Sequence, residues 1–268
     1  MSTSVSEVYQ HNKTFDPSTY TESYLSLSDR AEPFAKDLLL FRLQQLHQFY
    51  ITTGPMLSGC RILEYGGGPG HIYPLISAAP FASEIVFAEY AEQNRKVAEQ
   101  WKSYSSETPE MTALLEHVVR MLENNTAKNA VQERAMKLRS LISQILPCDI
   151  NQEVALRDCT LPFDIVSTHL CLTAATSSVE QYVLNLRKLA RLLRPGGMIV
   201  MTEPIGGTFY LVGSQRLPDL YVSSTEVVRE SLLQAGFTDV SIKTLKVRPT
   251  EVTDHVEYAF CTAVLDSV

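Results

Sequence analysis

The sequence predicts an α/β fold in which helices flank a doubly wound, mostly parallel sheet. From Arg61 onward, short apolar runs alternate with helix-forming segments, and this order gives parallel strands with helices on both faces. The first apolar run leads into "GGGPG" at residues 66–70, where glycines permit positive φ angles and let a ligand approach the backbone closely. A ligand-binding turn within an α/β sheet is therefore the starting hypothesis.

The length and charge of the chain limit the classes of protein to consider. For 268 residues we expect one domain spanning 1–268, with residues 1–60 as an N-terminal helical cap or lid and residues 61–268 as the ligand-binding core. The 23 basic and 30 acidic residues give a net charge of −7, and no long basic run is present to attract a phosphate backbone. We therefore expect no nucleic-acid partner.

The sequence shows no signal for a membrane, for secretion or for a metal. No apolar run approaches the roughly 18 residues of a membrane span, and the N-terminus lacks the basic start and apolar core of a secretory signal. The five cysteines include no CxxC pair, and the six histidines show no HExxH or HxH spacing. We expect a cytoplasmic monomer with no membrane association and no bound metal.

The N-terminal cap is expected to contain one long amphipathic helix over residues 28–51. Its apolar residues recur near a 3.6-residue rhythm and so share one face: Phe34, Leu38, Phe41, Leu46 and Phe49. Five strands of the core are expected at residues 61–65, 84–89, 142–147, 163–168 and 198–202. Residues 105–145 are mostly helix-forming, and we assign no chemistry to them.

The C-terminal region is expected to complete the sheet. Residues 224–236, "STEVVRESLLQAG", predict a helix, and Gly236 lies where a left-handed residue ends a helix. Two extended runs follow at residues 239–247 and 258–265. They are long enough to add an antiparallel hairpin at the sheet edge.

The spacing of the glycines separates the possible ligands. A P-loop requires GxxxxGK[ST], and no Lys-Ser or Lys-Thr follows this turn. A dinucleotide fingerprint requires GxGxxG, whereas Gly66, Gly68 and Gly70 give GxGxG. We expect a helix to begin near His71. Glu64, two positions before the first glycine, would repel a phosphate and suits an amino-acid-like ligand with a positive charge better.

Two carboxylates follow at the ends of later strands. Glu89 lies nineteen residues after Gly70, where a strand-end carboxylate can accept from both hydroxyls of a ribose. In "LPCDI", Asp149 can accept from the amino group of an adenine while the amide of Ile150 serves the ring. In isolation, Glu89 has the simpler interpretation of a surface carboxylate. The order of glycine turn, Glu89, Asp149 and then "RPGG" at residues 194–197 is far less generic.

This order resembles that of the class I S-adenosylmethionine-dependent methyltransferases. More closely, the chain resembles the small-molecule branch that contains nicotinamide, phenylethanolamine and indolethylamine N-methyltransferases and thioether S-methyltransferase. The matching stretches run nearly end to end and include "FDPSTYTESY", "ILEYGGGPGHIY", "EIVFAEYAEQN", "LPCDI" and "DIVSTHLCLTAA". The resemblance implies a Rossmann-like fold, S-adenosyl-L-methionine as cofactor, S-adenosyl-L-homocysteine as product and a small-molecule methyl acceptor.

The resemblance also implies roles in cofactor binding. Tyr20 matches the N-terminal tyrosine that closes over the methyl donor, and Tyr73 matches an aromatic residue at the donor's amino-acid end. Glu89 takes the ribose position, which is usually Asp in this branch. Leu25 replaces a second tyrosine of the family, with Tyr24 beside it. The full set expected to bind the cofactor is Tyr20, Tyr24, Glu64, Gly66, Gly68, Tyr73, Glu89, Tyr90, Asn94, Asp149, Ile150 and Thr168.

Methyl transfer from a sulfonium places few demands on reactive side chains. It is an in-line displacement, in which the nucleophile lies about 3 Å from the methyl carbon with its lone pair aligned. Because positioning supplies most of the catalysis, no triad or metal is required. His169, an extra residue relative to the family, and Cys171 could form a nucleophilic pair, but the reaction gives no reason for covalent catalysis.

The expected acceptor site follows from the resemblance and contains three acids. Glu203 matches the Asp that holds the carboxamide in the nicotinamide enzyme, and a carboxylate there can offset charge on the methylated nitrogen. Asp219 replaces a Ser of that enzyme, and Asp254 lies near the acid that grips the amine in the phenylethanolamine enzyme. Tyr210 matches an aromatic wall. We expect Tyr20 and Glu203 to be catalytic and these residues to bind substrate: Tyr20, Glu203, Tyr210, Asp219 and Asp254.

The sequence therefore predicts an S-adenosylmethionine-dependent N-methyltransferase, with nicotinamide or a related pyridine as the first choice of acceptor. One alternative is an enzyme for phenylethanolamine- or tryptamine-like arylalkylamines, since three acids around one site would favour amines. Another is a non-catalytic binder of S-adenosylmethionine or S-adenosylhomocysteine. An NAD-dependent oxidoreductase is disfavoured by the GxGxG spacing.

Overall fold

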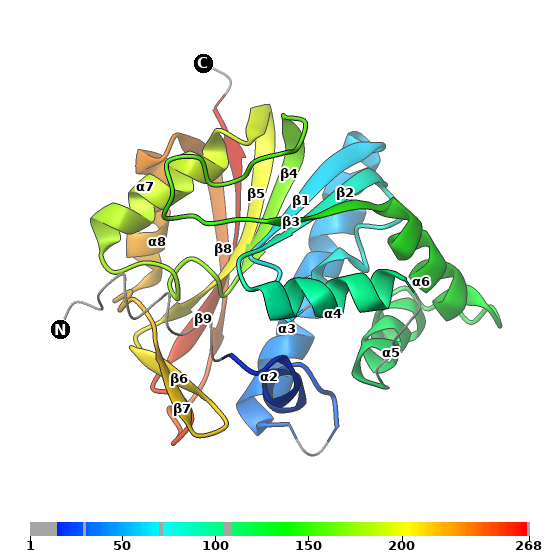
Figure 1. Ribbon diagram of the computed structural model, residues 1–268, viewed down its shortest axis with the longest axis horizontal. Coiled ribbons are helices and arrows are strands. Elements are labelled where there is room, and N and C mark those ends of the chain that lie inside the picture. Colours follow the sequence, from blue (N-terminus) through cyan, green and yellow to red (C-terminus); the bar gives the residue numbers. More distant parts are fainter. Residues whose placement is uncertain (1–14, 29–30, 70–71, 104–108, 267–268) are drawn as a thin grey trace.

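Seven strands form one mostly parallel sheet, as the alternating apolar runs predict. The computed structural model describes residues 15–28, 31–69, 72–103 and 109–266. The strands of the sheet are β1 Cys60–Tyr65, β2 Ala82–Glu89, β3 Ile142–Pro147, β4 Phe163–His169, β5 Leu193–Ile205, β8 Phe237–Lys246 and β9 Glu257–Leu265. Strands β1 to β5 pair in parallel, and β9 runs antiparallel to both β5 and β8, which confirms the predicted edge hairpin (Figure 1).

The strand order is β3-β2-β1-β4-β5-β9-β8, so the chain starts in the middle of the sheet. It moves outward through β2 and β3 to one side and then returns to build β4 and β5 on the other side of β1. Beyond the carboxyl ends of β1 and β4, loops leave in opposite directions and a crevice opens. The glycine turn that follows Tyr65 lies at this switch point.

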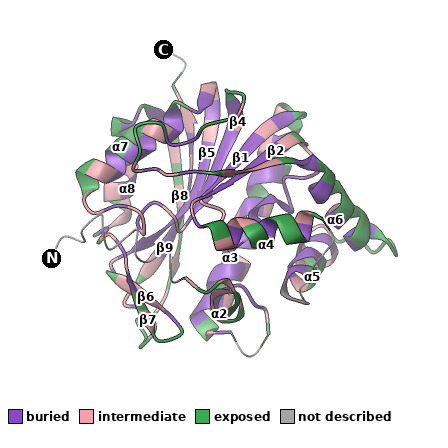
Figure 2. Ribbon diagram, viewed as in Figure 1, coloured by how far each residue is buried: buried purple, intermediate pink, exposed green. Residues whose placement is uncertain are grey.

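Helices cover both faces of the sheet. They are α3 Pro33–Thr53, α4 Glu92–Lys102, α5 Pro109–Glu116, α6 Ala130–Leu141, α7 Val179–Ala190 and α8 Thr225–Gln234. Successive strand residues belong to different cores: Ile62 packs into the cluster that includes α3 to α6, and Leu63 into the cluster of α7 and α8. The buried residues accordingly follow the central strands and the inward faces of the helices (Figure 2).

The N-terminal region forms the predicted helical cap. Helix α2 Pro17–Tyr24 begins after Asp16, whose carboxylate accepts from the Ser18 amide at 3.0 Å and from the Thr19 hydroxyl at 2.6 Å. Its last residue, Tyr24, donates a hydrogen bond to the Leu211 carbonyl of the small hairpin β6 Phe209–Val212 and β7 Gln215–Pro218. The cap and the hairpin thereby meet beside the sheet (Figure 1).

Three local expectations differ from the structure. The long helix of the cap begins at Pro33, later than expected, because proline suits the first helical turn and disfavours helix before it. The helix expected to begin near His71 has its start outside the described residues. In the described chain from residue 72 onward no long helix follows the glycine turn, because Tyr73–Leu75 is one 3₁₀ turn and Pro74 and Pro80 leave too short a stretch for a helix. Strand β5 starts at Leu193, since that residue already pairs with Phe163 ahead of the RPGG turn.

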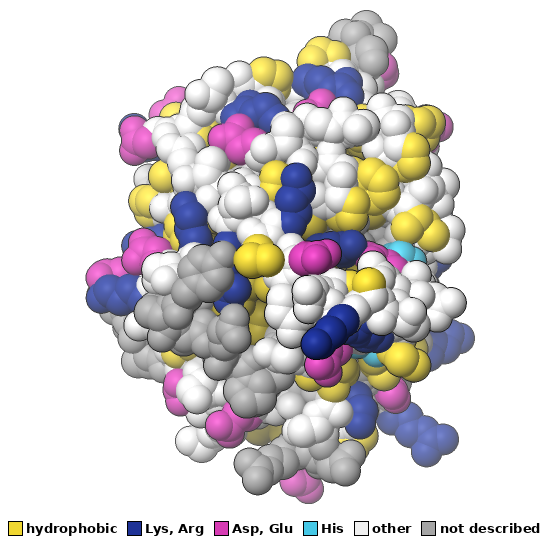
Figure 3. Space-filling model, turned by 90° about the vertical axis from the view of Figure 1, so that its right-hand side faces the viewer, with side chains coloured by type: hydrophobic (Ala, Val, Ile, Leu, Met, Phe, Trp, Pro, Cys, Tyr) yellow, Lys and Arg dark blue, Asp and Glu magenta, His cyan; other side chains and the backbone are white. Residues whose placement is uncertain are grey.

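Figure 3 shows that acidic and basic side chains lie interspersed on the face turned 90° from the first view. In the described part of the chain, no helix is both long enough and apolar enough to cross a membrane.

Candidate active site

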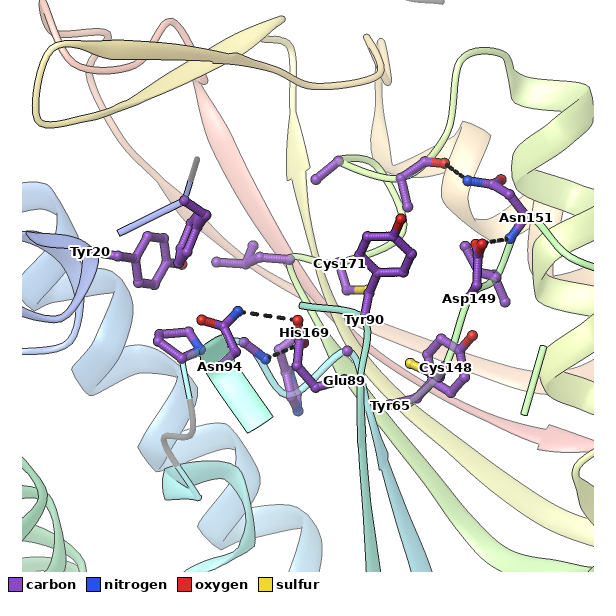
Figure 4. Close-up of a pocket in the computed structure, with 18 of the residues that line it drawn as sticks. Tyr20, Tyr65, Glu89, Tyr90, Asn94, Cys148, Asp149, Asn151, His169 and Cys171 are labelled. Atoms are coloured by element: carbon purple, nitrogen blue, oxygen red, sulfur yellow. Dashed lines mark hydrogen bonds between the residues drawn. The ribbon is translucent and has the colours of Figure 1, made fainter. Parts of the chain in front are cut away.

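A large cavity lies at the carboxyl ends of the parallel strands, where the topology places a binding site. Its volume is about 830 Å³, and residues from the N-terminal cap, the glycine turn and the loops after β2, β3 and β4 enclose it (Figure 4). Eight of the twelve expected cofactor-binding residues line it or belong to the turn beneath it: Tyr20, Gly66, Gly68, Glu89, Tyr90, Asn94, Asp149 and Ile150. The structure therefore brings together residues spread over 131 positions of sequence.

The glycine turn has a shape that side chains would disrupt. Gly66 has φ +70°, and a Cβ there would lie 2.1 Å from the Cys171 sulfur. A Cβ at Gly67 would lie 2.2 Å from the Phe87 ring. Gly68 has φ +64° and no atom within 4 Å of its hypothetical Cβ, and it lines the cavity. The turn thus packs tightly against the sheet on one side and offers open backbone on the other.

Glu89 holds the end of β2 and the glycine turn together. One carboxylate oxygen accepts from the Ala91 amide at 2.8 Å and the Asn94 side chain at 3.1 Å, and the other accepts from the Gly68 amide at 2.9 Å. Burial raises the pKa of Glu89, while these three bonds favour its charged form. A carboxylate offers about four acceptor positions, so capacity for a hydroxyl remains.

Asp149 and its neighbours form the opposite end of the cavity. The Asp149 carboxylate accepts from the Asn151 amide at 2.9 Å and from the Gln152 side chain at 3.2 Å. Ile150 is buried, and its carbonyl accepts from the Lys188 ammonium at 2.7 Å. Tyr90 lines the same cavity, close enough to Asp149 for their charges to interact, and Figure 4 draws its ring on the Asp149 side of the cavity. This end therefore offers a flat aromatic ring beside a fixed carboxylate.

A second cavity of about 450 Å³ adjoins the first and shares Tyr20, Leu170 and Tyr210 with it. Its other lining residues are Tyr24, Leu38, Arg42, Pro204, Asp219, His255 and Tyr258. The rings of Tyr20 and Tyr24 stack with centroids 5.0 Å apart, and Tyr210 meets Tyr24 edge-on at 6.3 Å. Aromatic walls of this kind suit a flat ligand.

Asp219 provides a carboxylate in the wall of this second cavity, next to His255. Asp219 Oδ2 lies 3.2 Å from His255 Nε2, whereas Asp219 Oδ1 is buried and has no hydrogen-bond partner. Burial raises the pKa of the Asp219 carboxyl, and the neighbouring His255 opposes that shift. On its other ring nitrogen, His255 lies 2.7 Å from the Thr253 hydroxyl. The unpartnered oxygen is available to a ligand donor.

Five of the expected site residues line neither cavity. Glu64 is buried under the glycine turn, and burial raises its pKa to about 8, against the opposing effects of Ser167 and Arg42. Thr168 is also buried, inside β4, and its hydroxyl has no hydrogen-bond partner. Tyr73 is buried and accepts a hydrogen bond from Arg42.

The other two are the acids expected at the acceptor. Glu203 is fully buried within β5, neither of its carboxylate oxygens has a hydrogen-bond partner, and burial raises its pKa strongly. Asp254 accepts from the Thr208 amide at 2.7 Å, the Thr208 hydroxyl at 2.8 Å and the Phe209 amide at 3.0 Å. Asp254 therefore anchors the start of β6.

His169 and Cys171 line the first cavity but do not form a nucleophilic pair (Figure 4). The two ring nitrogens of His169 lie 3.1 Å from the Ser167 hydroxyl and 2.9 Å from the Thr202 hydroxyl. Burial lowers the pKa of His169 to about 3 and raises the pKa of the Cys171 thiol. A neutral imidazole and a protonated thiol leave no activated nucleophile.

Sequence reasoning missed three polar residues of the second cavity: Arg42, His255 and Tyr258. Arg42 carries a signal, because it is a cation on the apolar face of α3, four residues from both Leu38 and Leu46. His255 and Tyr258 show no sequence feature that separates them from ordinary loop and strand residues. Among the residues that the structure describes, no cluster of His, Cys, Asp and Glu is placed to hold a metal.

The fold is that of solved methyltransferase structures, two of which hold S-adenosylmethionine or S-adenosyl-l-homocysteine. Magnesium protoporphyrin IX methyltransferase (ChlM) from Synechocystis PCC 6803, with S-adenosylmethionine bound, matches with a TM-score of 0.56 and 14% identity, covering 98% of this chain and 97% of that one. N-methyltransferase NodS from Bradyrhizobium japonicum WM9, with S-adenosyl-l-homocysteine, matches with a TM-score of 0.51 and 14% identity, covering 97% and 98%.

The chain belongs to the NNMT/PNMT/TEMT family, whose model matches residues 3–263. Human nicotinamide N-methyltransferase is 32% identical over 225 residues, which cover 84% of this chain and 82% of that protein. Mouse indolethylamine N-methyltransferase is 30% identical, with coverages of 84% and 83%. Human phenylethanolamine N-methyltransferase is 27% identical, with coverages of 76% and 71%. The predicted family, cofactor and N-methyltransferase activity are thereby confirmed.

Proposed function

We propose that the protein methylates the nitrogen of a small aromatic amine, with the methyl donor in the first cavity and the acceptor in the second. The observation that carries this proposal is the unpartnered Asp219 Oδ1 in a tyrosine-lined cavity. That cavity shares Tyr20 and Tyr210 with the donor cavity, so an acceptor beside Asp219 meets the donor at these rings.

The residues of the first cavity fit S-adenosylmethionine. Glu89 retains acceptor capacity for the ribose hydroxyls, and Asp149 would lie at the adenine with Tyr90 along the ring. The open backbone at Gly68 admits close approach of the ligand. Tyr20, on the N-terminal cap, would then close over the methionine end and help to exclude water.

An amine fits the second cavity better than nicotinamide does. A charged Asp219 accepts from N–H groups and also attracts a positive charge, which an ammonium group carries and the neutral carboxamide of nicotinamide does not. Glu203, at the position that holds the carboxamide in the nicotinamide enzyme, is buried away from the cavity. Nicotinamide remains the second candidate, because the chain is 32% identical to the human enzyme of that name.

When bound in the first cavity, S-adenosylmethionine would supply a methyl group on a sulfonium, and the electron pair of the carbon–sulfur bond would remain on sulfur. The protein positions the neutral amine so that its lone pair faces that carbon at about 3 Å. Asp219 Oδ1 accepts an N–H of the amine, offsets the positive charge that develops on nitrogen and can receive the proton that nitrogen loses. Tyr24 and Tyr210 confine the ring of the acceptor.

An acceptor panel tests the proposal. The protein is incubated with labelled S-adenosylmethionine and with phenylethanolamine, tryptamine, quinoline or nicotinamide, and methylated products are measured by mass spectrometry. We expect an amine to be methylated with the highest kcat/KM, and Asp219→Asn to lower that value about 10- to 100-fold through loss of a charged hydrogen bond. Glu230→Gln, an exposed change on α8, is the control. Binding of S-adenosylhomocysteine without any product would contradict the proposal.

A further inference from the structure

We propose that Arg42 binds a carboxylate of the methyl acceptor, so that the acceptor is an aromatic amine that also carries an acid group. This inference rests on the proposed function and narrows its substrate class. Neither the family expectation nor the sequence assigned a role to Arg42. Three features of this residue and its cavity carry the inference.

The first feature is its position. Arg42 lies in the middle of α3, and only 2% of its surface is exposed. It lines the second cavity, together with Asp219 and the tyrosines, and it does not line the first. A buried cation on the wall of a ligand cavity therefore faces the acceptor side of the site.

The second feature is the free edge of its guanidinium. Nη1 donates to the Tyr73 hydroxyl, and the guanidinium carbon lies 5.1 Å from the centre of the Tyr73 ring. These contacts fix the plane of the group. Nε is buried without a hydrogen-bond partner, and Nη2 has none within the described part of the chain. The Nε–Nη2 edge is the one that binds a carboxylate through two parallel hydrogen bonds.

The third feature is the lack of a resident counter-ion. Among the described residues, no carboxylate oxygen lies within 4.0 Å of the Arg42 nitrogens. Glu64 feels its charge, but with a pKa of about 8 that carboxyl is mostly protonated at neutral pH. A buried charge without a partner is strongly unfavourable, and a ligand carboxylate would offset that cost.

The lining of the second cavity therefore carries two groups of opposite charge. Asp219 has an unpartnered oxygen and Arg42 has an unpartnered guanidinium edge, with no ion pair joining the two residues. Tyr20, Tyr24 and Tyr210 line the same cavity. A ligand with an amine, an aromatic ring and a carboxylate satisfies both groups at once, whereas a simple arylalkylamine leaves Arg42 unsatisfied.

Matched acceptor pairs test this inference: tryptophan against tryptamine and phenylalanine against phenylethylamine, in which the acid carries an added carboxylate, and nicotinic acid against nicotinamide, in which a carboxylate replaces the carboxamide. Each compound is compared by kcat/KM and by calorimetric binding to the protein loaded with S-adenosylhomocysteine. We expect the acid of at least one pair to be favoured about 10- to 100-fold, as for a bidentate charged contact. Arg42→Met should abolish that preference, and Arg42→Lys, which keeps the charge but not the fork, should restore only part of it.

The outcomes separate this inference from the proposed function. If the amines without a carboxylate are methylated and no acid is favoured in either assay, the inference fails while the proposed function stands. If no compound is methylated, the proposed function fails, and calorimetry still tests whether Arg42 selects acids. The donor also carries a carboxylate. If Arg42→Met weakens S-adenosylhomocysteine binding tenfold but leaves the acceptor ratios unchanged, Arg42 serves the donor and the inference is overturned.

Discussion

Replacing Glu89 with Gln is the sharpest perturbation of the donor cavity. The Glu89 carboxylate accepts from the Gly68 amide, the Ala91 amide and the Asn94 side chain, at 2.8 to 3.1 Å. A glutamine has one acceptor oxygen, so its NH₂ group must face at least one of these N–H donors. Leaving a buried donor unsatisfied costs about 1–3 kcal/mol. Either the glycine turn loses its hydrogen bond to the end of β2, or the start of α4 does.

The loss should appear in cofactor affinity as well as in stability. The ribose would lose a charged acceptor worth about 1.5–3 kcal/mol, so we expect S-adenosylhomocysteine to bind about 10- to 100-fold more weakly to Glu89→Gln. Isothermal calorimetry measures this at a temperature where circular dichroism shows the variant folded.

Glu84→Gln is the matched control for this experiment. Glu84 lies on the same strand but accepts from Arg61 at 2.6 Å and from the Ser143 hydroxyl at 2.7 Å, and it does not line the cavity. Its loss should lower stability slightly and leave cofactor affinity unchanged. If Glu89→Gln binds S-adenosylhomocysteine as tightly as the native protein, Glu89 does not hold the ribose and the placement of the donor is wrong.

Three further predictions concern the glycine turn, a buried acid and the cap. Gly68→Ala should weaken S-adenosylhomocysteine binding, measured by calorimetry, whereas Gly59→Ala should not. Both glycines have positive φ and open space at Cβ, so an alanine at either position costs about 1–2 kcal/mol of backbone strain. Only Gly68 lines the cavity. Equal effects of the two changes would argue against the turn as a binding element. Because burial raises the pKa of Glu64 from 4.5 to about 8, the folded state binds a proton more tightly than the unfolded state. The contribution of Glu64 to the free energy of unfolding should therefore fall as pH rises from about 5 to 8, by at most about 1.4 kcal/mol per pH unit. Urea unfolding of Glu64→Gln at several pH values should show a stability that lacks this fall. If the native protein and Glu64→Gln show the same dependence of stability on pH, the prediction is refuted. Asp16→Ala removes the N-cap of α2 and should lower stability by about 1 kcal/mol in thermal unfolding, and no change would mean that the cap contributes little.

The sheet and the first cavity followed largely from local sequence. The parallel strands β1 and β2 are short, mostly apolar runs, because buried parallel strands need apolar residues on both faces. Glu89 and Asn94 lie five positions apart across the start of α4, so their contact is nearly built into the chain. The glycine turn could be predicted because glycine adopts the positive φ of Gly66 and Gly68 without strain.

The second cavity was harder to predict, because packing between distant segments builds it. Arg42 meets Tyr73 across 31 positions, and Asp219 meets His255 across two separate loops. Position alone also does not set the direction of a side chain. Glu203 ends up inside the sheet because successive residues of a strand face opposite sides, and its neighbour Pro204 lines the cavity instead.

The central claim is that two adjoining cavities hold the donor and the acceptor and meet at Tyr20 and Tyr210. A crystal structure of the protein with S-adenosylhomocysteine and the best amine of the panel tests it most directly. We expect the ribose to lie against Glu89, the sulfur to face Tyr20 and the amine nitrogen to lie within hydrogen-bond distance of Asp219. An amine bound outside the second cavity, or a ribose away from Glu89, would contradict it.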